Sequence, residues 1–530
     1  MKRLRIIPRF SMNKRAILGL LLGGSVVFTS CTSEDSPASS AESKKSIVIL
    51  FESDSHCEVS GYPKIAGLRD AINQSDTAWA GAVCCGDFLQ GGPIGAVSKG
   101  KYITDIMKAV GYDVVTVGNH EFEFGGANME NLLSQLGAPV VCANLFRHGE
   151  SEPIFPAYTI CQYGDKRVAF IGILTPETIE TQRFAFFDSD GKQLYDLTGD
   201  GLTELLQQTV DDVRAKGADY VVALSHVGEK SDIAQTSYDL IKGTRGIDVV
   251  LDGHTHTSVP SAYVNNLDGK AVLVAQSGNK FKNIGKLVIK SNGELWATLL
   301  KTEEVAEESQ SVSEVIETVN AELKSMTSKV ICHSDYPLLS LRDGNTISTL
   351  EESSIGNLLA DAYRDHYQAD IGLQHGSSLT VDIAAGDITM QDMFNLMPFE
   401  DQLYLIEVKG DLLLQTLTRC TASLPNRFFP QCSGLKYTIH MKSNTVTDVM
   451  VLDRASGEYK PLDMEKDYQV SLGVFYSSVG FYGMLKDCKV VKVETTTTRD
   501  ALVNYLQMTL NGNLGDGYQS TQGRIMILDD

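Results

Sequence analysis

The sequence has little positive charge, no cysteine pair with zinc-binding spacing, and no long apolar run beyond its N-terminal region. It has 46 Lys and Arg residues against 67 Asp and Glu residues, which gives a formal net charge of −21. Such an acidic surface repels a phosphate backbone and argues against a nucleic-acid polymer as the main ligand. The ten cysteines contain no CxxC pattern, so a cysteine zinc site is not indicated.

The composition is otherwise that of a globular protein. Of the 530 residues, 43% are hydrophobic and 21% are charged. A chain of this length exceeds what one hydrophobic core usually holds, and we expect two or more domains. We find no internal repeat.

The N-terminal region has the features of an export signal. The first 30 residues carry six basic residues and no acidic one, and Ala16–Thr29 is apolar but too short to span a bilayer comfortably. Ser30-Cys31 at its end resembles the lipobox of bacterial lipoproteins, which implies lipidation of Cys31; the alternative is a plain signal peptide cleaved nearby. Residues 31–45 are rich in Ser, Ala, Glu and Asp, as in a flexible tether. We expect an exported chain anchored by this lipid to a bacterial outer membrane, on its periplasmic or surface face.

Short apolar runs alternate with helix-like stretches over residues 46–302. Lys101–Val110 and Leu202–Lys216 are two of the helix-like stretches. Continuous apolar runs are typical of strands buried on both faces, and their alternation with helices predicts a layered α/β domain. The predicted strands are 46–51, 82–85, 114–117, 140–143, 168–173, 220–224 and 249–251.

The pattern changes after residue 302. Apolar residues recur at helical spacing through residues 303–329, which predicts a helix linking two domains. Residues 330–530 then mix a helix at Ile355–Tyr367 with short strands, which predicts a smaller α+β domain. The predicted strands there are 403–408, 436–441, 446–452 and 467–472.

Polar residues of metal-binding types follow five of the N-terminal strands. Any one of these motifs is more typical of a capped turn or a surface loop. Together they would leave many unsatisfied polar groups in apolar surroundings unless a metal were bound. Because open α/β sheets place their sites at the carboxyl ends of strands, we predict a metal site there. The residues are Asp54, His56, Asp87, Asn119, His120, His226, His254 and His256.

These motifs occur in the order seen in a known family. Asp54-Ser55-His56, Gly86-Asp87, Gly118-Asn119-His120-Glu121-Phe122, Leu224-Ser225-His226 and Gly253-His254-Thr255-His256 resemble the calcineurin-like metallophosphoesterases. Segments 354–362, 385–389, 397–399 and 429–435 resemble the C-terminal domain of the bacterial 5′-nucleotidase and UDP-sugar hydrolase family. The resemblance implies an N-terminal sandwich of two mixed sheets flanked by helices, followed by a substrate-binding domain.

The resemblance also implies two divalent metal ions. Carboxylate and imidazole ligands are suited to zinc, manganese or iron. It assigns Asp54, His56 and His256 to the first ion, Asn119, His226 and His254 to the second, and Asp87 to both. His120 is then the catalytic histidine that binds no metal, and Glu123 stands where the family has an Asp that orients this imidazole.

The second domain departs from the family pattern. Thr380 stands where the family has a phosphate-binding Arg, and the segment 479–483 lacks the family's Asp. Arg427 or a lysine is a candidate replacement for the lost Arg. Phe429 and Phe475 match the two aromatics that sandwich a nucleobase, although either is equally consistent with plain core.

The expected function is hydrolysis of a phosphate monoester, with a nucleoside 5′-monophosphate or related nucleotide as substrate. Two alternatives stay open from the sequence. One is a metallophosphodiesterase that acts on cyclic nucleotides or another small phosphodiester. The other is a surface-binding lipoprotein without catalysis. The expected partners are a small phosphorylated molecule and, through the N-terminal lipid, a membrane.

Overall fold

The computed structural model describes residues 45–188, 191–231, 235–342, 344–379, 381–397, 401–475 and 481–530. Residues Lys45–Asp530 form one compact unit. The predicted signal peptide, Cys31 and Thr380 lie outside the described residues. Within the described ranges, no helix is both long and apolar enough to cross a membrane.

The first sheet has six strands in the order β14-β13-β1-β2-β3-β4. Strands β1 to β4 run parallel, and β13 and β14 are antiparallel additions at one side. The strands are β1 (Ser46–Glu52), β2 (Ala78–Cys84), β3 (Val114–Thr116), β4 (Val140–Val141), β13 (Asn283–Ile289) and β14 (Leu295–Lys301).

The second sheet also has six strands, in the order β11-β12-β10-β9-β7-β6. Its four inner strands run parallel, and the two edge strands are antiparallel. The strands are β6 (Tyr158–Tyr163), β7 (Lys166–Leu174), β9 (Tyr220–His226), β10 (Val249–Asp252), β11 (Ser258–Asn265) and β12 (Ala271–Ser277).

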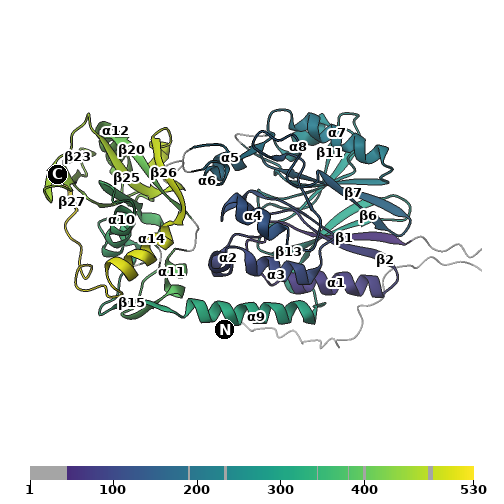
Figure 1. The fold of residues 1–530 in the computed structure, drawn as a ribbon, viewed down its shortest axis with the longest axis horizontal. Helices are drawn as coiled ribbons and strands as arrows, with labels where there is room; N and C mark the ends of the chain where they lie inside the picture. Colours follow the sequence, from purple (N-terminus) through teal and green to yellow (C-terminus); the bar gives the residue numbers. More distant parts are fainter. Residues whose placement is uncertain are drawn as a thin grey trace, which may run out of the picture. The chain divides into compact units, whose positions relative to one another are not determined.

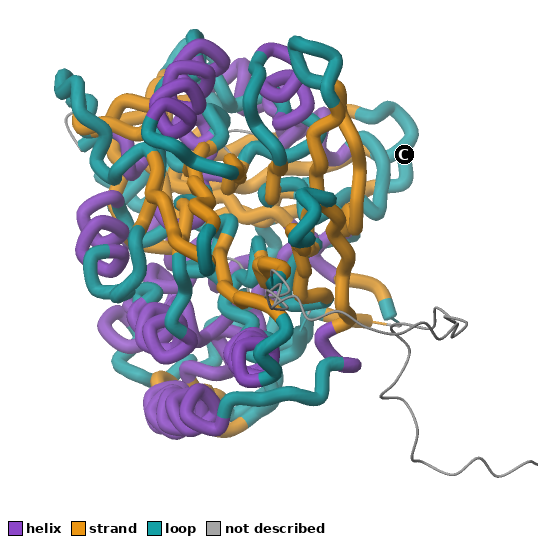
Figure 2. Tube along the Cα trace, turned by 90° about the vertical axis from the view of Figure 1, so that its right-hand side faces the viewer, coloured by secondary structure: helices purple, strands orange, loops and turns teal. Residues whose placement is uncertain are grey.

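The two sheets pack face to face between helical layers. Fully buried side chains such as Phe51 of the first sheet and Phe170 and Leu224 of the second form the core between them. Figure 1 shows α1 and α3 beside the first sheet and α7 and α8 beside the second, and Figure 2 shows strands running between helices. This arrangement confirms the predicted sandwich. The helices are α1 (Tyr62–Gln74), α2 (Gly92–Ser98), α3 (Lys101–Val110), α4 (Gly126–Leu133), α5 (Thr178–Thr181), α6 (Arg183–Phe186), α7 (Leu202–Ala215) and α8 (Ser237–Gly243).

The helix predicted over residues 303–329 is α9 (Gln310–Thr327). Its buried residues Val312 and Val319 join the core that also holds residues of α1 and α3. Helical spacing of apolar residues on one face therefore attaches this helix to the N-terminal sandwich. The domain limits at residues 302 and 330 stay a prediction.

The C-terminal part mixes two sheets with helices. The larger sheet has the order β21-β18-β25-β20-β26, and the smaller has the order β24-β23-β22-β27. Two hydrophobic cores fill this part, which fits the predicted α+β class. The strands are β18 (Ile371–His375), β20 (Gln402–Lys409), β21 (Pro430–Ser433), β22 (Leu435–His440), β23 (Thr445–Asp453), β24 (Glu458–Pro461), β25 (Asp467–Gly473), β26 (Lys489–Thr497) and β27 (Ile525–Leu528), and the helices are α10 (Ser354–Tyr367), α11 (Met390–Leu396), α12 (Gly410–Thr421) and α14 (Thr498–Asn504).

Three further strand pairs lie outside these sheets: β5 (Leu145–Arg147) with β8 (Tyr195–Leu197), β15 (Val330–Ser334) with β19 (Gly386–Thr389), and β16 (Leu341–Arg342) with β17 (Asn345–Thr346). The cysteines of the described residues are free thiols, and Cys420 and Cys432 are not joined. Cys84 and Cys85 are buried, as the apolar run around them predicts.

Candidate metal centre

Five strands deliver polar side chains to one place. In the first sheet, the loops after the neighbouring strands β1, β2 and β3 carry some of them, and in the second sheet the ends of β9 and β10 carry the rest. Backbone hydrogen bonds tie the first two loops together, because Asp54 N donates to Gly86 O at 3.0 Å and His56 N donates to Asp87 O at 3.0 Å. The residues so placed are Asp54, His56, Asp87, Asn119, His120, His226, His254 and His256.

One group of ligand atoms comes from Asp54, His56, Asp87 and His256. One donor atom from each of the four lies within 4.8 Å of the others. His56 Nε2 and His256 Nε2 are 3.0 Å apart, and His256 Nε2 is 3.5 Å from Asp54 Oδ1. His56 Nε2 is 3.8 Å from Asp87 Oδ2. Two imidazole nitrogens that point at each other and at two carboxylates fit a bound cation.

A second group adjoins the first through Asp87. His226 Nε2 lies 3.1 Å from Asp87 Oδ2, and His254 Nδ1 lies 2.9 Å from Asn119 Oδ1. The rings of His226 and His254 have centroids 5.4 Å apart. The structure therefore brings all seven predicted ligands together, with Asp87 between the two groups. Their individual assignment to one ion or the other stays a prediction.

The outward nitrogens of two site histidines are held by partners from neighbouring loops. His56 Nδ1 lies 3.0 Å from Gln90 Oε1, and His226 Nδ1 donates to Cys85 O at 2.7 Å. Such bonds fix the tautomer and the ring orientation of a ligating histidine. Both rings are therefore set to present Nε2 to the cluster.

The other two histidines have similar outer contacts. His254 Nε2 lies 3.2 Å from Glu177 Oε2, and His256 Nδ1 lies 3.2 Å from Asn279 Nδ2. His254 consequently presents Nδ1 to the cluster, whereas His256 presents Nε2. Sequence reasoning missed Gln90, Glu177 and Asn279. Gln90 follows Asp87 in the same loop but lies outside the motif, and Glu177 and Asn279 lie in loops that carry no motif.

The backbone at the site is in a conformation that L residues rarely adopt. Five of the predicted ligands have positive φ, namely Asp54 (54°), His56 (43°), Asp87 (60°), His254 (75°) and His256 (58°). Residues held in the left-handed region cluster at functional sites, because surrounding contacts must impose the strained conformation. The concentration of strained residues in these loops indicates that their conformation serves to direct the ligand side chains toward a common point.

Two glycines allow the loops to approach this closely. A Cβ atom on Gly118 would lie 2.2 Å from Asp87 Oδ1, and one on Gly253 would lie 2.8 Å from His226 Nδ1. Both distances are far below van der Waals contact. Any side chain at either position would push the loops apart.

The electrostatics of the cluster call for a cation. Burial raises the pKa of Asp54 to about 7, despite the opposing effect of His226. Burial lowers the pKa of His56 to about 4 and keeps this imidazole neutral, the form that ligates metals. Burial alone would lower the pKa of His226, but the carboxylates of Asp87 and Asp54 raise it to about 10. Buried carboxylates beside imidazoles, among them the neutral ring of His56, fit a metal-binding set.

His120 is oriented differently from the other site histidines. Its Nδ1 lies 2.9 Å from Glu123 Oε2, and its backbone N donates to Asp87 Oδ1 at 2.8 Å. Gln182 Nε2 donates to the same Glu123 oxygen at 3.3 Å and steadies it. The longer Glu thus reaches the ring. Burial alone would lower the pKa of His120, but the Asp87 and Glu123 carboxylates raise this pKa to about 9.

The comparisons with known proteins agree with this geometry. Residues 47–258 match the calcineurin-like phosphoesterases, and residues 330–487 match the 5′-nucleotidase C-terminal domain. The chain therefore carries a calcineurin-like phosphoesterase domain followed by a 5′-nucleotidase C-terminal domain. Enzymes with the calcineurin-like phosphoesterase fold use two divalent metals, and the cluster around Asp87 fits them.

Among curated relatives, the phosphoesterase is 24% identical over 495 residues to the trifunctional nucleotide phosphoesterase protein YfkN of Bacillus subtilis (strain 168), covering 82% of this chain and 32% of that protein. It is 26% identical over 464 residues to the 5′-nucleotidase of Bos taurus, covering 76% of this chain and 75% of the relative. The chain spans about a third of the length of the first curated relatives it matches.

Solved structures share the fold over nearly the whole chain. A putative 5′-nucleotidase from Staphylococcus aureus has a TM-score of 0.66 at 20% identity, covering 91% of this chain and 100% of that one. The 5′-nucleotidase precursor from Thermus thermophilus has a TM-score of 0.58 at 24% identity, covering 92% of this chain and 100% of that one. At these identities the likeness concerns the fold alone.

The predicted substrate-binding residues of the C-terminal domain do not all face solvent. Phe429 is fully buried in the domain core, so its ring has no open face and does not fit the predicted stacking role. Phe475 is 39% exposed, with its ring centroid 6.3 Å from that of His375. The Arg427 guanidinium lies 4.6 Å from the ring centroid of Phe428.

Further aromatic rings adjoin Phe475, and sequence reasoning gave them no role. Phe428 makes edge contacts with His375 at 6.2 Å and with Tyr482 at 5.0 Å. The Arg419 guanidinium lies 4.8 Å from the Tyr482 ring centroid, and Tyr482 is 47% exposed. We call His375, Phe428, Phe475 and Tyr482 the aromatic cluster. His375 and Phe428 are buried, whereas Phe475 and Tyr482 are exposed beside cationic groups, a combination suited to a nucleobase.

Substitution of the two predicted stacking residues should show which one is a core residue and which one contacts the substrate. Phe429→Ala is expected to lower the free energy of unfolding by about 3–5 kcal/mol, because it empties a buried site. Phe475→Ala is expected to change stability by no more than about 0.5 kcal/mol and to raise KM, because its ring is exposed. Denaturant unfolding and steady-state kinetics on both variants give the comparison. A well-folded Phe429→Ala variant with raised KM would restore Phe429 as a substrate contact.

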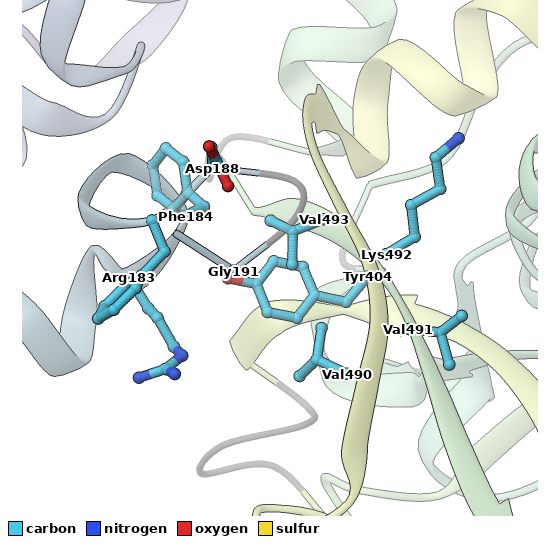
Figure 3. A pocket seen from close by; sticks show the side chains of 10 residues that line it. Arg183, Phe184, Asp188, Gly191, Tyr404, Val490, Val491, Lys492 and Val493 are labelled. Carbon is cyan, nitrogen blue, oxygen red and sulfur yellow. The ribbon is translucent and has the colours of Figure 1, made fainter. Parts of the chain in front are cut away.

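A separate cavity of about 300 Å³ lies beside α6, β20 and β26 (Figure 3). Arg183 and Phe184 line it together with Tyr404 and residues 490–493. None of the predicted site residues lines this cavity. The candidate site is thus located by the chemistry of its side chains rather than by the size of a hollow.

Proposed function

We propose that this phosphoesterase is an exported enzyme that hydrolyses a phosphate monoester, with a nucleoside 5′-monophosphate or a related nucleotide as substrate. The observation that carries the proposal is the convergence of seven oxygen and imidazole donors, with the carboxylate of Asp87 between their two groups. The curated relatives named above as a 5′-nucleotidase and a nucleotide phosphoesterase support the substrate class.

The metal ligands would serve a two-ion site. When bound, two divalent ions supply Lewis acidity and neutralise the negative charge of the phosphoryl oxygens. Asp87 holds the two halves of the site at a fixed separation, because its Oδ2 faces His226 and His56 while its Oδ1 accepts from His120 N. The outer partners of the histidines keep each ring turned toward the centre.

His120 would handle the proton of the leaving oxygen. Glu123 accepts from its Nδ1, which leaves Nε2 free to donate toward a substrate. The raised pKa of His120 keeps the imidazolium available as a proton donor near neutral pH. Glu123 and Gln182 hold the ring in place without contacting the reacting atoms.

The C-terminal domain would supply recognition of the organic part of the substrate. The exposed rings of Phe475 and Tyr482 are the candidate stacking surfaces, and Arg427 and Arg419 place positive charge in the aromatic cluster. In the family, a phosphate-binding Arg stands at the position of Thr380. Arg427 and Arg419 are candidates to bind phosphate in its place. Recognition by stacking tolerates several bases, since every nucleobase has a π face.

A side-by-side assay of a monoester and a diester tests the substrate class. Phosphate release from AMP is expected to exceed cleavage of a cyclic nucleotide monophosphate under the same metal loading. The reverse order would show a phosphodiesterase. Absence of both activities in a metal-loaded, folded protein would indicate a binding protein.

We propose further that lipid on Cys31 anchors the chain to the outer membrane. Cys31→Ala is expected to move the protein from the membrane fraction to the soluble fraction with unchanged activity, because the anchor lies outside the described fold. Cys488→Ala, which changes a half-buried thiol of the C-terminal domain, is the matched control. Fractionation followed by immunoblotting gives the answer, and unchanged partitioning of Cys31→Ala would contradict lipid anchoring.

A further inference from the structure

Glu121 has an unusual set of partners for a buried carboxylate. It is fully buried in the short 3₁₀ helix Asn119–Phe122. Four backbone N–H groups donate to its side chain: Asp87 N at 2.8 Å and Gly118 N at 2.6 Å to Oε2, and Phe88 N at 2.7 Å and Leu89 N at 3.1 Å to Oε1. Both oxygens are therefore fully engaged with main chain, and neither is offered to a metal.

These four bonds join two loops that carry different parts of the metal centre. Asp87, Phe88 and Leu89 belong to the loop after β2, whereas Gly118 precedes Asn119 and His120 after β3. The loops approach so closely at Gly118 that a Cβ there would collide with Asp87. The carboxylate of Glu121 lies between the two loops and accepts hydrogen bonds from both.

We infer that Glu121 is a positioning residue that fixes Asp87 relative to Asn119 and His120 before any metal binds. The inference rests on the proposed two-metal site. Without Glu121, four N–H groups beside the shared ligand would lose their acceptor, and buried donors of this kind are costly to leave unpaired. The loops would then move to find other partners, and the ligand spacing would be lost.

The chemistry of the partners requires a carboxylate of this length. A Gln at position 121 would turn an NH₂ group toward two N–H donors whichever way its amide is oriented. An Asp would be one methylene shorter and would not reach the acceptor positions on both loops. We therefore expect neither substitution to reproduce the bonding of Glu121.

The test is the Mn²⁺ affinity of the folded full-length chain, measured by calorimetry. Glu121→Gln is expected to weaken Mn²⁺ binding by about 10- to 100-fold, the range found when outer partners of metal ligands are removed. Glu123→Gln is the matched control from the same segment. It should keep the wild-type Mn²⁺ affinity, because the Glu123 carboxylate pairs with His120 and Gln182, which are not among the predicted ligands.

The outcomes separate this inference from the proposed function. If the wild-type chain binds none of Mn²⁺, Zn²⁺ and Fe²⁺, the proposed function fails. If the wild type binds and Glu121→Gln binds within about twofold of it, the positioning role is wrong. A lowered unfolding temperature of the metal-free variant with unchanged affinity would show a purely stabilising residue and would also overturn it.

Hydrogen exchange on the wild-type chain covers the case in which the variants do not fold. The amides of Asp87, Phe88, Leu89 and Gly118 are expected to be protected in the metal-free protein, because Glu121 accepts from all four. Exchange at the rate of exposed loop amides would contradict the inference without any substitution.

Discussion

Replacing Asp87 by Asn is expected to remove bound metal and turnover together. Asp87 is buried, and its Oδ2 lies 3.1 Å from His226 Nε2 and 3.8 Å from His56 Nε2. It is the carboxylate that the two groups of donors share. An Asn keeps the shape but loses the negative charge that would hold two cations, and it would turn an amide NH₂ toward one of them.

The expected loss of turnover for Asp87→Asn exceeds the ~10²–10⁴-fold range that loss of general acid–base help alone produces. Elemental analysis of the dialysed protein measures metal, and phosphate release measures turnover. Asp113→Asn is the control, since Asp113 accepts from Ala82 N and Tyr163 OH outside the metal cluster and should leave metal content unchanged. Full metal occupancy in Asp87→Asn would contradict a shared ligand at this position.

Replacing His120 by Asn is expected to lower turnover by ~10²–10⁴-fold while metal content stays near that of the wild type. His120 is the one site histidine whose ring is paired with a carboxylate three residues away, Glu123, and the resemblance assigns it no metal. Loss of this ring removes a proton donor and leaves the seven predicted ligands in place. The same elemental analysis and kinetic assay apply.

Two results would overturn this role for His120. If His120→Asn strips metal as thoroughly as Asp87→Asn, His120 is a ligand. If turnover is unchanged, the ring is structural and the leaving oxygen takes its proton from water or another residue. Glu123→Gln should show a smaller loss than His120→Asn, because the ring remains but its orientation is less well held.

Features encoded in local pattern were predicted well. The run Ser46–Phe51 is continuous and apolar because β1 is buried on both faces, and Lys101–Val110 forms α3 because its apolar residues share one helical face. The polar residues after β1, β2 and β3 meet because these strands are parallel neighbours. Strand order in the second sheet, which brings His226 beside His254, is a long-range property that local pattern does not contain.

Features that depend on packing or on loop geometry could not be predicted. Gln90, Glu177 and Asn279 contact site histidines from positions outside the motifs, and nothing in their spacing indicates these contacts. Phe429 and Phe475 are the same residue type, and each directly follows another apolar residue in the sequence. Only the structure shows that the first fills the core while the second is exposed.

The most direct test of the two-metal phosphoesterase is a metal titration of the metal-free, folded wild-type chain, with activity toward AMP followed at each step. Binding is expected to saturate at two divalent ions per chain, and phosphate release is expected to reach its maximum only when the second ion is bound. Saturation at a single ion, or full activity in the absence of any ion, would contradict the two-metal site.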